Sequence, residues 1–380
     1  MISLIAHARR LVLLALAVST ATATVTATVT VAVPAAAAVP AAAAVPAVAG
    51  SAAGGAAGAV SAAAQAPVQD RIHAAFRSWL FDNKISNAGL AVMRDNQLVG
   101  SYGSNEMSAE TPAPVASLSK AITAVCVMSL IDNGRLRFDT RLSSLGARFR
   151  RATGPWSSRA VGDITIEQLL RHRSRISADP SQKGLGDVPN SASADLTLIR
   201  RALAQPLLTM PSGDVYNNIN YALLGYVIRT VTGESYESYC RRVALAPRGA
   251  GQARIGAGTR AMGAFGGWEI SAVDYAMFAR AFDPRTRLLS PAAHRFIDAK
   301  ANSRSPSAAL GVFVVATPQG RNVFHHGSWQ SSATTPKQFG AFFAMWNNGI
   351  SVVATYDRNV TDAARLALDN TLRKAAYSRG

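Results

Sequence analysis

The chain has 380 residues, 49% of them hydrophobic, and its 39 Lys and Arg against 22 Asp and Glu give a formal net charge of +17. This length and apolar content exclude a minimal module, because they suffice to bury the core of one large domain or of two modest ones. No nucleic-acid-binding motif accompanies the charge, so we predict no nucleic-acid partner. Anionic cell-wall polymers as partners and a merely solubilising arginine-rich surface remain the two alternatives.

The amino end has the pattern of an export signal. Residues 1–10 carry Arg9 and Arg10 and no acid, and the short apolar run Leu11–Val18 is followed by Ala-Thr repeats. We therefore predict a signal peptide over residues 1–30, and a protein that is secreted or held in the periplasm or cell envelope of a bacterium. A transmembrane anchor is the alternative. The apolar run is too short for one, so we expect no stable membrane span after signal cleavage.

A tether is predicted next. Residues 31–67 consist almost entirely of Ala, Val, Pro and Gly, and Pro34, Pro40 and Pro46 recur too often for a helix to persist. This composition predicts a disordered Ala/Pro-rich segment. We expect the folded domain to span residues 68–380, where 37 Lys and Arg and 22 Asp and Glu leave a net charge of +15.

The folded part opens with a helix and a hairpin. Residues Gln69–Asp82 place large apolar side chains at helical spacing, which predicts an amphipathic helix packed on a sheet. The runs Ala88–Arg94 and Gln97–Tyr102 are predicted strands, because the dipeptide Asp95-Asn96 between them suits a two-residue hairpin turn.

A central apolar helix is predicted within Pro114–Gly134, with the glycine as its left-handed C-terminal cap. Ser117 and Lys120 then lie one turn apart, where the lysine amine can touch the serine hydroxyl. Burial lowers the pKa of a lysine until it can act as a base. Ser-x-x-Lys specifies only two positions, so a solvated lysine beside a helix start is the alternative. Of the six lysines, only Lys120 has a serine three residues before it.

The two cysteines, Cys126 and Cys240, are too few for a four-ligand zinc site and form no Cys-x-x-Cys pair. A disulfide between them and two buried unpaired thiols both remain open. Because each lies in an apparent helix, we favour the unpaired thiols.

The middle of the chain, about residues 136–285, has a mostly helical pattern. Thr165 and Gln168 form a capping box that opens a helix over Ile166–His172. Further helices are predicted over Leu196–Ala204 and Tyr221–Thr232, and the polar segment Pro211–Asn218 between them is a predicted loop.

Strand patterns return after Pro284. The expected strands are Leu310–Ala316, Asn322–His325, Phe339–Trp346 and Ile350–Tyr356, followed by a last helix over Thr361–Ala376. Strands at both ends of the domain with helices between them predict an α+β fold, in which an antiparallel sheet flanked by helices carries an inserted all-helical domain.

Two more elements accompany the Ser-x-x-Lys pair. Tyr216-Asn217-Asn218 forms a Tyr-x-Asn, and His325-His326-Gly327 ends a short apolar strand. With these three motifs in order, residues 69–376 resemble the serine β-lactamase and penicillin-binding superfamily. The similar branch joins class C β-lactamases, D-alanyl-D-alanine carboxypeptidases and related esterases. The segments Ile164–Ser174 and Tyr216–Gly225 extend the resemblance, which implies a β-lactamase/transpeptidase-like fold.

The resemblance implies catalytic roles for three residues. Ser117 would be the acylated nucleophile, Lys120 would accept its proton or tune its surroundings, and Tyr216 would relay protons. We expect the cations near Tyr216 to lower the pKa of its hydroxyl toward use as a general base. Taken alone, each residue favours a structural interpretation, Tyr216 as a half-buried turn tyrosine and Asn218 as a helix N-cap.

The resemblance also implies substrate-binding roles. Asn218 would hold Lys120 and the substrate amide, His325 would face the substrate carboxylate or orient Tyr216, and Gly327 would let substrate approach its strand. The backbone amides of Ser117 and Ser328 would form the oxyanion hole. No metal and no cofactor are expected, because adjacent strand residues such as the two histidines face opposite sides of a sheet.

The chain departs from the family pattern at two informative positions. Arg175 stands where relatives commonly have glycine, and His325 stands where many have lysine. The histidine favours the peptidase and esterase members over class C β-lactamases. We therefore expect an exported serine hydrolase acting through an acyl-enzyme on a D-amino-acid peptide, a small ester or a β-lactam. A catalytically idle protein of the same fold that binds peptidoglycan is the alternative.

Overall fold

The computed structural model describes residues 66–183, 185, 188–209, 214–331 and 337–378. The predicted signal peptide and nearly all of the predicted tether lie outside these residues, as does part of the predicted loop Pro211–Asn218. The first described helix, α2 (Val68–Asp82), begins where the folded domain was expected to begin. Within the described part of the chain, no helix is both long and apolar enough to cross a membrane.

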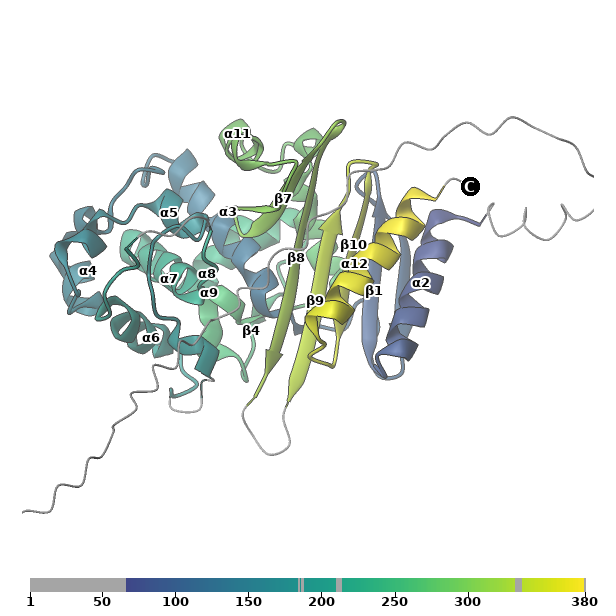
Figure 1. The fold of residues 1–380 in the computed structure, drawn as a ribbon, viewed down its shortest axis with the longest axis horizontal. Coiled ribbons are helices and arrows are strands. Elements are labelled where there is room, and N and C mark those ends of the chain that lie inside the picture. The colour runs from purple at the N-terminus through teal and green to yellow at the C-terminus, as the bar shows by residue number, and fades with distance from the viewer. Residues whose placement is uncertain (1–65, 184, 186–187, 210–213, 332–336, 379–380) are drawn as a thin grey trace, which may run out of the picture. The chain divides into compact units, whose positions relative to one another are not determined.

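A seven-stranded antiparallel sheet in the order β2-β1-β10-β9-β8-β7-β6 forms the centre of the fold. Its first two strands come from the start of the domain and the other five from the end, so β1 lies beside β10 (Figure 1). In this pairing Ala88 is the partner of Tyr356. The strands are β1 (Ala88–Arg94), β2 (Gln97–Ser104), β6 (Ser307–Ala309), β7 (Val312–Thr317), β8 (Gly320–Gln330), β9 (Gln338–Met345) and β10 (Ile350–Tyr356).

Helices cover both faces of the sheet. On one face, α2 packs beside α12 (Asp362–Tyr377) over a core that includes Leu90 and Val92 of β1. The alternate residues Ala91 and Met93 belong to a second core on the opposite face. Because successive strand side chains point to opposite faces, a strand covered on both faces is apolar throughout rather than alternating.

The second core is shared with α3 (Ser119–Asp132), α10 (Ala272–Ala279) and the helical region that follows α3. Gly134 takes a positive φ of 70° just after α3, as expected of its cap. The region contains α4 (Gly146–Thr153), α5 (Ile166–Leu170), α6 (Ala194–Leu203), α7 (Asn218–Thr232), α8 (Tyr236–Cys240) and α9 (Gly263–Gly266), and α11 (Pro291–Lys300) follows α10.

These elements confirm the predicted α+β fold with an inserted helical region, and the capping box of Thr165 and Gln168 is present. Several details differ from the predictions. The strand predicted to end at His325 is longer, because β8 continues through Gly327 to Gln330 and the histidines lie inside it. The insertion also contains two short strands, β4 (Arg254–Ile255) and β5 (Trp268–Ile270), which form a small sheet with β3 (Ala113–Pro114). The helix α5 stops before His172, whose positive φ of 55° cannot continue a right-handed helix.

The prediction of two unpaired thiols is wrong. Cys126 on α3 and Cys240 at the end of α8 form a disulfide, with their Cα atoms 5.5 Å apart and a sequence separation of 114 residues. Both residues are fully buried. The bond therefore links the central helix to the helical region from inside the core.

Candidate active site

The nucleophile candidate lies on a tight turn rather than in the central helix. Ser117 belongs to a single 3₁₀ turn, Ala116–Leu118, which joins β3 to α3. Ala116 has a positive φ of 45°, a costly conformation for a residue with a side chain. This turn leaves Ser117 only partly buried while its neighbours Ala116 and Leu118 are buried. The sequence pattern predicts Ser117 and Lys120 on one helix, but α3 begins only at Ser119.

Lys120 is in the first turn of α3 and has no exposed surface. Its Nζ lies 2.9 Å from Ser117 Oγ and 2.8 Å from the carbonyl oxygen of Phe265. Burial lowers the pKa of Lys120 to about 7, against the opposing charge of Asp179. Near neutral pH a substantial fraction of this amine is therefore uncharged and able to accept a proton.

Tyr216 completes the contact with the nucleophile. Its hydroxyl donates a hydrogen bond of 2.7 Å to Ser117 Oγ, and the Lys120 Nζ lies 4.9 Å from its ring centroid. The expectation of a lowered pKa is wrong. Burial raises the pKa of Tyr216 above its ordinary value, and the charge of Asp179 acts in the same direction, so the hydroxyl stays protonated.

A buried histidine supports Tyr216 from behind. The rings of His172 and Tyr216 stack with their centroids 4.4 Å apart. The Nδ1 of His172 accepts the Asn217 amide at 3.1 Å and lies 3.0 Å from Nδ2 of Asn220. Burial, together with the charge of Lys120, lowers the pKa of His172 well below its usual range, so the ring is neutral. The contacts of His172 are those of a residue that positions Tyr216.

Asn218 occupies the first turn of α7, and the N-cap is Asn217, whose side chain accepts the amide of Ile219. The side-chain amide of Asn218 donates to Ser181 at 2.9 Å, while its buried Oδ1 has no hydrogen-bond partner among the described residues. The amide N–H of Asn218 donates to Asp179 at 2.8 Å. Among the described residues, no direct hydrogen bond joins Asn218 to Lys120. The expected role of Asn218 in holding Lys120 therefore stays a prediction.

The third motif lies on β8. His325 is 4% exposed, its ring centroid is 6.1 Å from that of Tyr216, and its Nδ1 is 2.7 Å from the His326 carbonyl oxygen. Burial and the nearby Lys120 lower the pKa of His325 to about 3. His326 instead stacks on Phe342, with centroids 4.7 Å apart. The two histidines thus have separate surroundings, and in the described part of the chain no group of three or more His, Cys, Asp or Glu is arranged to hold a metal.

Gly327 brings β8 against the nucleophile turn. A Cβ at this position would lie 2.3 Å from the Val115 carbonyl oxygen and 3.2 Å from the Ser117 amide nitrogen. The next side chain, Ser328, turns toward α12, where its Oγ accepts a hydrogen bond of 2.7 Å from Arg365. The Ser328 side chain is thus engaged on the side of α12, and the expected contribution of its backbone amide to an oxyanion hole stays a prediction.

Sequence reasoning missed Asp179. Its charge acts on both Lys120 and Tyr216, and it accepts the Asn218 amide across 39 residues of sequence. The only available signal was an isolated acid in an arginine-rich loop, and that pattern is too common to single out a residue.

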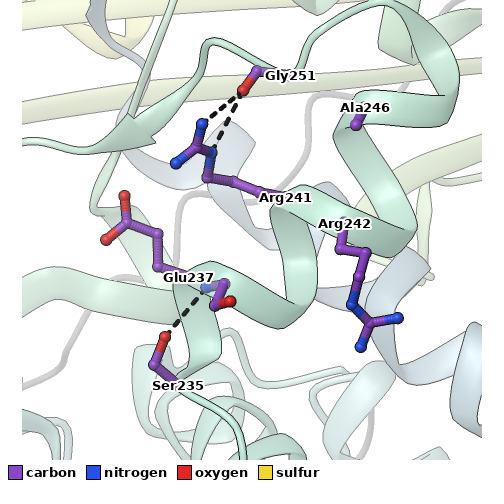
Figure 2. A pocket seen from close by; sticks show the side chains of 7 residues that line it. Ser235, Glu237, Arg241, Arg242, Ala246 and Gly251 are labelled. Atoms are coloured by element: carbon purple, nitrogen blue, oxygen red, sulfur yellow. Dashed lines mark hydrogen bonds between the residues drawn. The ribbon is translucent and has the colours of Figure 1, made fainter.

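An open surface hollow of about 520 Å³ lies elsewhere, around α8 and the π-helical turn Arg241–Leu245 (Figure 2). Its charged groups already have partners within the protein. Arg241 donates to the Gly251 carbonyl, Arg242 pairs with Glu234, and Glu237 accepts the Ile255 amide. None of the residues that contact Ser117 line it, so we do not assign catalysis to this hollow.

Comparisons with known proteins find similarity in both sequence and fold. Residues 60–376 match the Beta-lactamase family. Protein flp of Staphylococcus aureus (strain COL) is 30% identical over 141 residues, which are 37% of this chain and 27% of that protein. The chain thus matches only about a quarter of the length of this curated relative.

Two solved structures share the fold. A D-stereospecific amidohydrolase from Streptomyces sp. superposes with a TM-score of 0.66 at 17% identity, covering 82% of this chain and 99% of that one. A beta-lactamase/D-alanine carboxypeptidase from Pseudomonas syringae gives 0.64 at 15% identity, covering 81% and 99%. Both confirm the β-lactamase/transpeptidase-like fold. With the family match extending over most of its length, the chain belongs to the Beta-lactamase family of serine hydrolases.

Proposed function

We propose that the protein hydrolyses amide or ester bonds through an acyl-enzyme on Ser117. The observation that supports this most strongly is the placement of Ser117 Oγ within 2.9 Å of a buried lysine amine and 2.7 Å of the Tyr216 hydroxyl. A serine hydroxyl is a weak nucleophile until a neighbouring base takes its proton, and Lys120 with its pKa of about 7 suits that task.

In the proposed acylation step, neutral Lys120 accepts the hydroxyl proton as Ser117 Oγ bonds to the substrate carbonyl carbon. The negative charge that develops on the carbonyl oxygen is held by the backbone N–H groups of Ser117 and Ser328. When the intermediate collapses, the bond to the leaving group breaks. Tyr216 gives its proton to the leaving amine or alcohol and recovers one from Lys120, so protonation is balanced.

Deacylation reverses the same proton path. A water molecule gives a proton to Lys120, directly or through Tyr216, and its oxygen attacks the ester carbonyl. The ester bond breaks, Ser117 recovers its proton, and the carboxylic acid product leaves. Because Tyr216 stays protonated until the reaction, its role in this scheme is that of a relay beside the lysine base.

For the substrate we propose a D-amino-acid peptide or amide, or a small ester, ahead of a β-lactam. The names of structurally similar proteins, a D-stereospecific amidohydrolase and a beta-lactamase/D-alanine carboxypeptidase, support the D-configuration. The neutral, buried His325 supports placing peptides, amides and esters ahead of β-lactams, since it supplies no cation for the carboxylate that β-lactams carry.

The test is covalent labelling with a fluorescent fluorophosphonate and a fluorescent penicillin, followed by mapping of the adduct. We expect at least one probe to label Ser117, and Ser117→Ala to abolish that label while leaving the circular dichroism spectrum unchanged. No adduct with either probe, or an adduct that survives Ser117→Ala, would show that the proposal is wrong and would favour a catalytically idle binding protein.

We also propose that the chain is exported and that the net charge of +15 of its folded domain draws it to anionic cell-wall polymers. Cosedimentation with purified cell walls should be strong at low salt and lost at high salt, because exposed charges are screened over about 8 Å at physiological ionic strength. Binding that is indifferent to salt would argue against an electrostatic partner.

A further inference from the structure

Two helices of the inserted region carry a concentration of arginines without acidic neighbours in the sequence. Arg148, Arg150 and Arg151 lie on α4, Arg159 opens the 3₁₀ turn that follows it, and Arg200 lies on α6. All five residues are exposed. The sequence contains no Asp or Glu between residues 142 and 162 or between residues 196 and 213. We call these five residues the α4 patch.

Contacts between the elements place these arginines on one surface. Nε of Arg200 donates a hydrogen bond of 2.6 Å to the carbonyl oxygen of Ala152 near the end of α4. The guanidinium of Arg150 lies 4.7 Å from the centroid of the Trp156 ring. The turn that starts at Arg159 packs on the same ring, since a Cβ on its Gly162 would lie 3.0 Å from it. Figure 1 shows α4 and α6 on the side of the helical region that lies away from the sheet.

The charge of the α4 patch is not neutralised by the described part of the chain. The acids at its borders are already paired, Asp163 with Arg141 at 3.0 Å and Asp195 with Arg229 at 2.6 Å. Among the described residues, none of the five patch arginines forms an ion pair. The patch therefore presents an uncompensated positive field to solvent.

Two of these arginines weaken the helix that carries them. Arg148 lies in the first turn of α4, where the helix dipole disfavours a cation, and one turn before Arg151, where like charges repel. Within the described chain, neither side chain has a hydrogen bond or ion pair that would offset this repulsion. An anionic partner outside the chain would turn both charges into favourable contacts.

The chemistry of the patch suits a soluble polyanion better than a bilayer. Its cations are all arginines, whose planar guanidinium groups bind phosphate and carboxylate groups in a bidentate manner. Binding in a bilayer interface requires apolar side chains beside the charges. The exposed large hydrophobic residues of the described chain are on other elements than α4 and α6: Phe81, Leu98, Val99, Leu366 and Tyr377.

We propose that the α4 patch is the docking site for anionic cell-wall polymers. This inference rests on the proposed attraction of the basic domain to such polymers and assigns it to one surface instead of to the charge of the whole domain. None of the residues that contact Ser117 belongs to the patch. A chain docked through α4 therefore keeps its nucleophile free to react.

The experiment measures cosedimentation of the purified full chain with purified bacterial cell walls at about 0.15 M salt. Arg148→Gln/Arg151→Gln removes two positive charges from the patch. Arg77→Gln/Arg358→Gln removes two elsewhere and is the matched control, because both residues are exposed and have no ion pair among the described residues. The patch variant should bind about 30-fold more weakly, since each basic side chain near an anionic surface contributes roughly fivefold to affinity. The control should stay within about 3-fold, because exposed charges beyond about 8 Å from the polymer are screened.

Arg148→Lys/Arg151→Lys keeps the charges and should bind walls nearly as well as the unmodified chain, which a loss of folding would not allow. Equal weakening of the patch variant and the control overturns the docking site and leaves only attraction by net charge. Binding to vesicles of equal parts phosphatidylglycerol and phosphatidylcholine that outlasts wall binding as salt is raised also overturns the proposal, because it assigns the patch to a membrane.

Chemical protection tests the site without any variant. Walls bound to the unmodified chain should protect Arg148 and Arg151 from phenylglyoxal and leave Arg77 and Arg358 reactive, and the reverse pattern overturns the proposal. Fluorophosphonate labelling of Ser117 in the same samples keeps the acyl-enzyme function separate. Failure of that labelling with intact wall binding rejects the acyl-enzyme and supports the docking site, whereas an unmodified chain that does not bind walls rejects both the docking site and the proposed polymer attraction.

Discussion

Gly327 on β8 and Val115 before the nucleophile turn approach so closely that a Cβ on the glycine would lie 2.3 Å from the Val115 carbonyl oxygen. Real Cβ atoms do not tolerate such a contact with backbone, so Gly327→Ala must move either the strand or the turn that carries Ser117. We expect acylation by a fluorophosphonate to slow by about 100-fold or more, since a misplacement of about 1 Å costs that much.

Gly258→Ala is the matched control, because no described atom outside its own chain neighbours lies within 4 Å of the place its Cβ would occupy. Equal rates for the two variants would contradict the proposed approach of β8.

The pH profile should report Lys120. Because burial lowers its pKa to about 7, the proton-accepting form dominates above that pH and is lost below it. We expect kcat/KM to fall about tenfold per pH unit below pH 7 and to level off above it. The same assay on Lys120→Arg should show almost no activity between about pH 6 and pH 9, since a guanidinium stays charged. Retention of full activity by Lys120→Arg would show that Lys120 is not the base.

Burial of Lys120 should also make the unfolding free energy depend on pH. The folded pKa of about 7 is below the ordinary value of 10.5, so between these values the unfolded chain binds a proton that the folded chain does not. The resulting loss of unfolding free energy is complete below pH 7 and disappears as the pH approaches 10.5. Relative to Lys120→Met, the unmodified protein should therefore gain about 1.4 kcal/mol of unfolding free energy per pH unit above pH 7. Urea unfolding at about pH 7, 8 and 9 measures this slope, and parallel curves would contradict it.

The side chain of Ser328 should be dispensable for chemistry, although its backbone is assigned to the oxyanion hole. Its hydroxyl accepts a hydrogen bond from Arg365 on the side of α12. Ser328→Ala should thus keep the labelling rate of Ser117 within about 3-fold and lower the unfolding free energy by about 1 kcal/mol. A loss of labelling beyond about 30-fold at unchanged stability would mean that the hydroxyl itself takes part in catalysis.

The disulfide between Cys126 and Cys240 should contribute strongly to stability, because it closes a long loop in the unfolded chain. The double variant Cys126→Ala/Cys240→Ala should lose about 2–5 kcal/mol of unfolding free energy. Dithiothreitol should destabilise the unmodified chain and leave the double variant unaffected. A reductant effect of equal size on both proteins would exclude the disulfide as its cause.

Local patterns predicted much of the fold. The bounds of β1 and β10 were predicted to the residue, because both are apolar strands next to strong hairpin signals. The Ser-x-x-Lys, Tyr-x-Asn and His-His-Gly motifs converge in space, although they lie on α3, α7 and β8 and the loops before them. Motif spacing and family resemblance sufficed for this part of the site.

The predictions that failed concerned burial and contacts between distant segments. The resemblance led us to expect cationic neighbours that lower the pKa of Tyr216, but the sequence does not show that burial and the charge of Asp179 raise that pKa. Asp179 approaches Tyr216 only through a loop that contacts the start of α7. The cysteine pairing likewise rests on the packing of α3 against α8, for which periodicity carries no information.

The pairing of β1 with β10 has a consequence for synthesis. Residue 88 and residue 356 are partners, so the central strands of the sheet cannot close until nearly the whole domain has left the ribosome. A nascent chain that ends before β9 would leave β8 without its hydrogen-bonded neighbour, and Gly327 without the strand that holds it against Ser117. Such long-range pairing slows folding. We therefore expect premature truncations to yield aggregation-prone chains rather than weakly active enzymes.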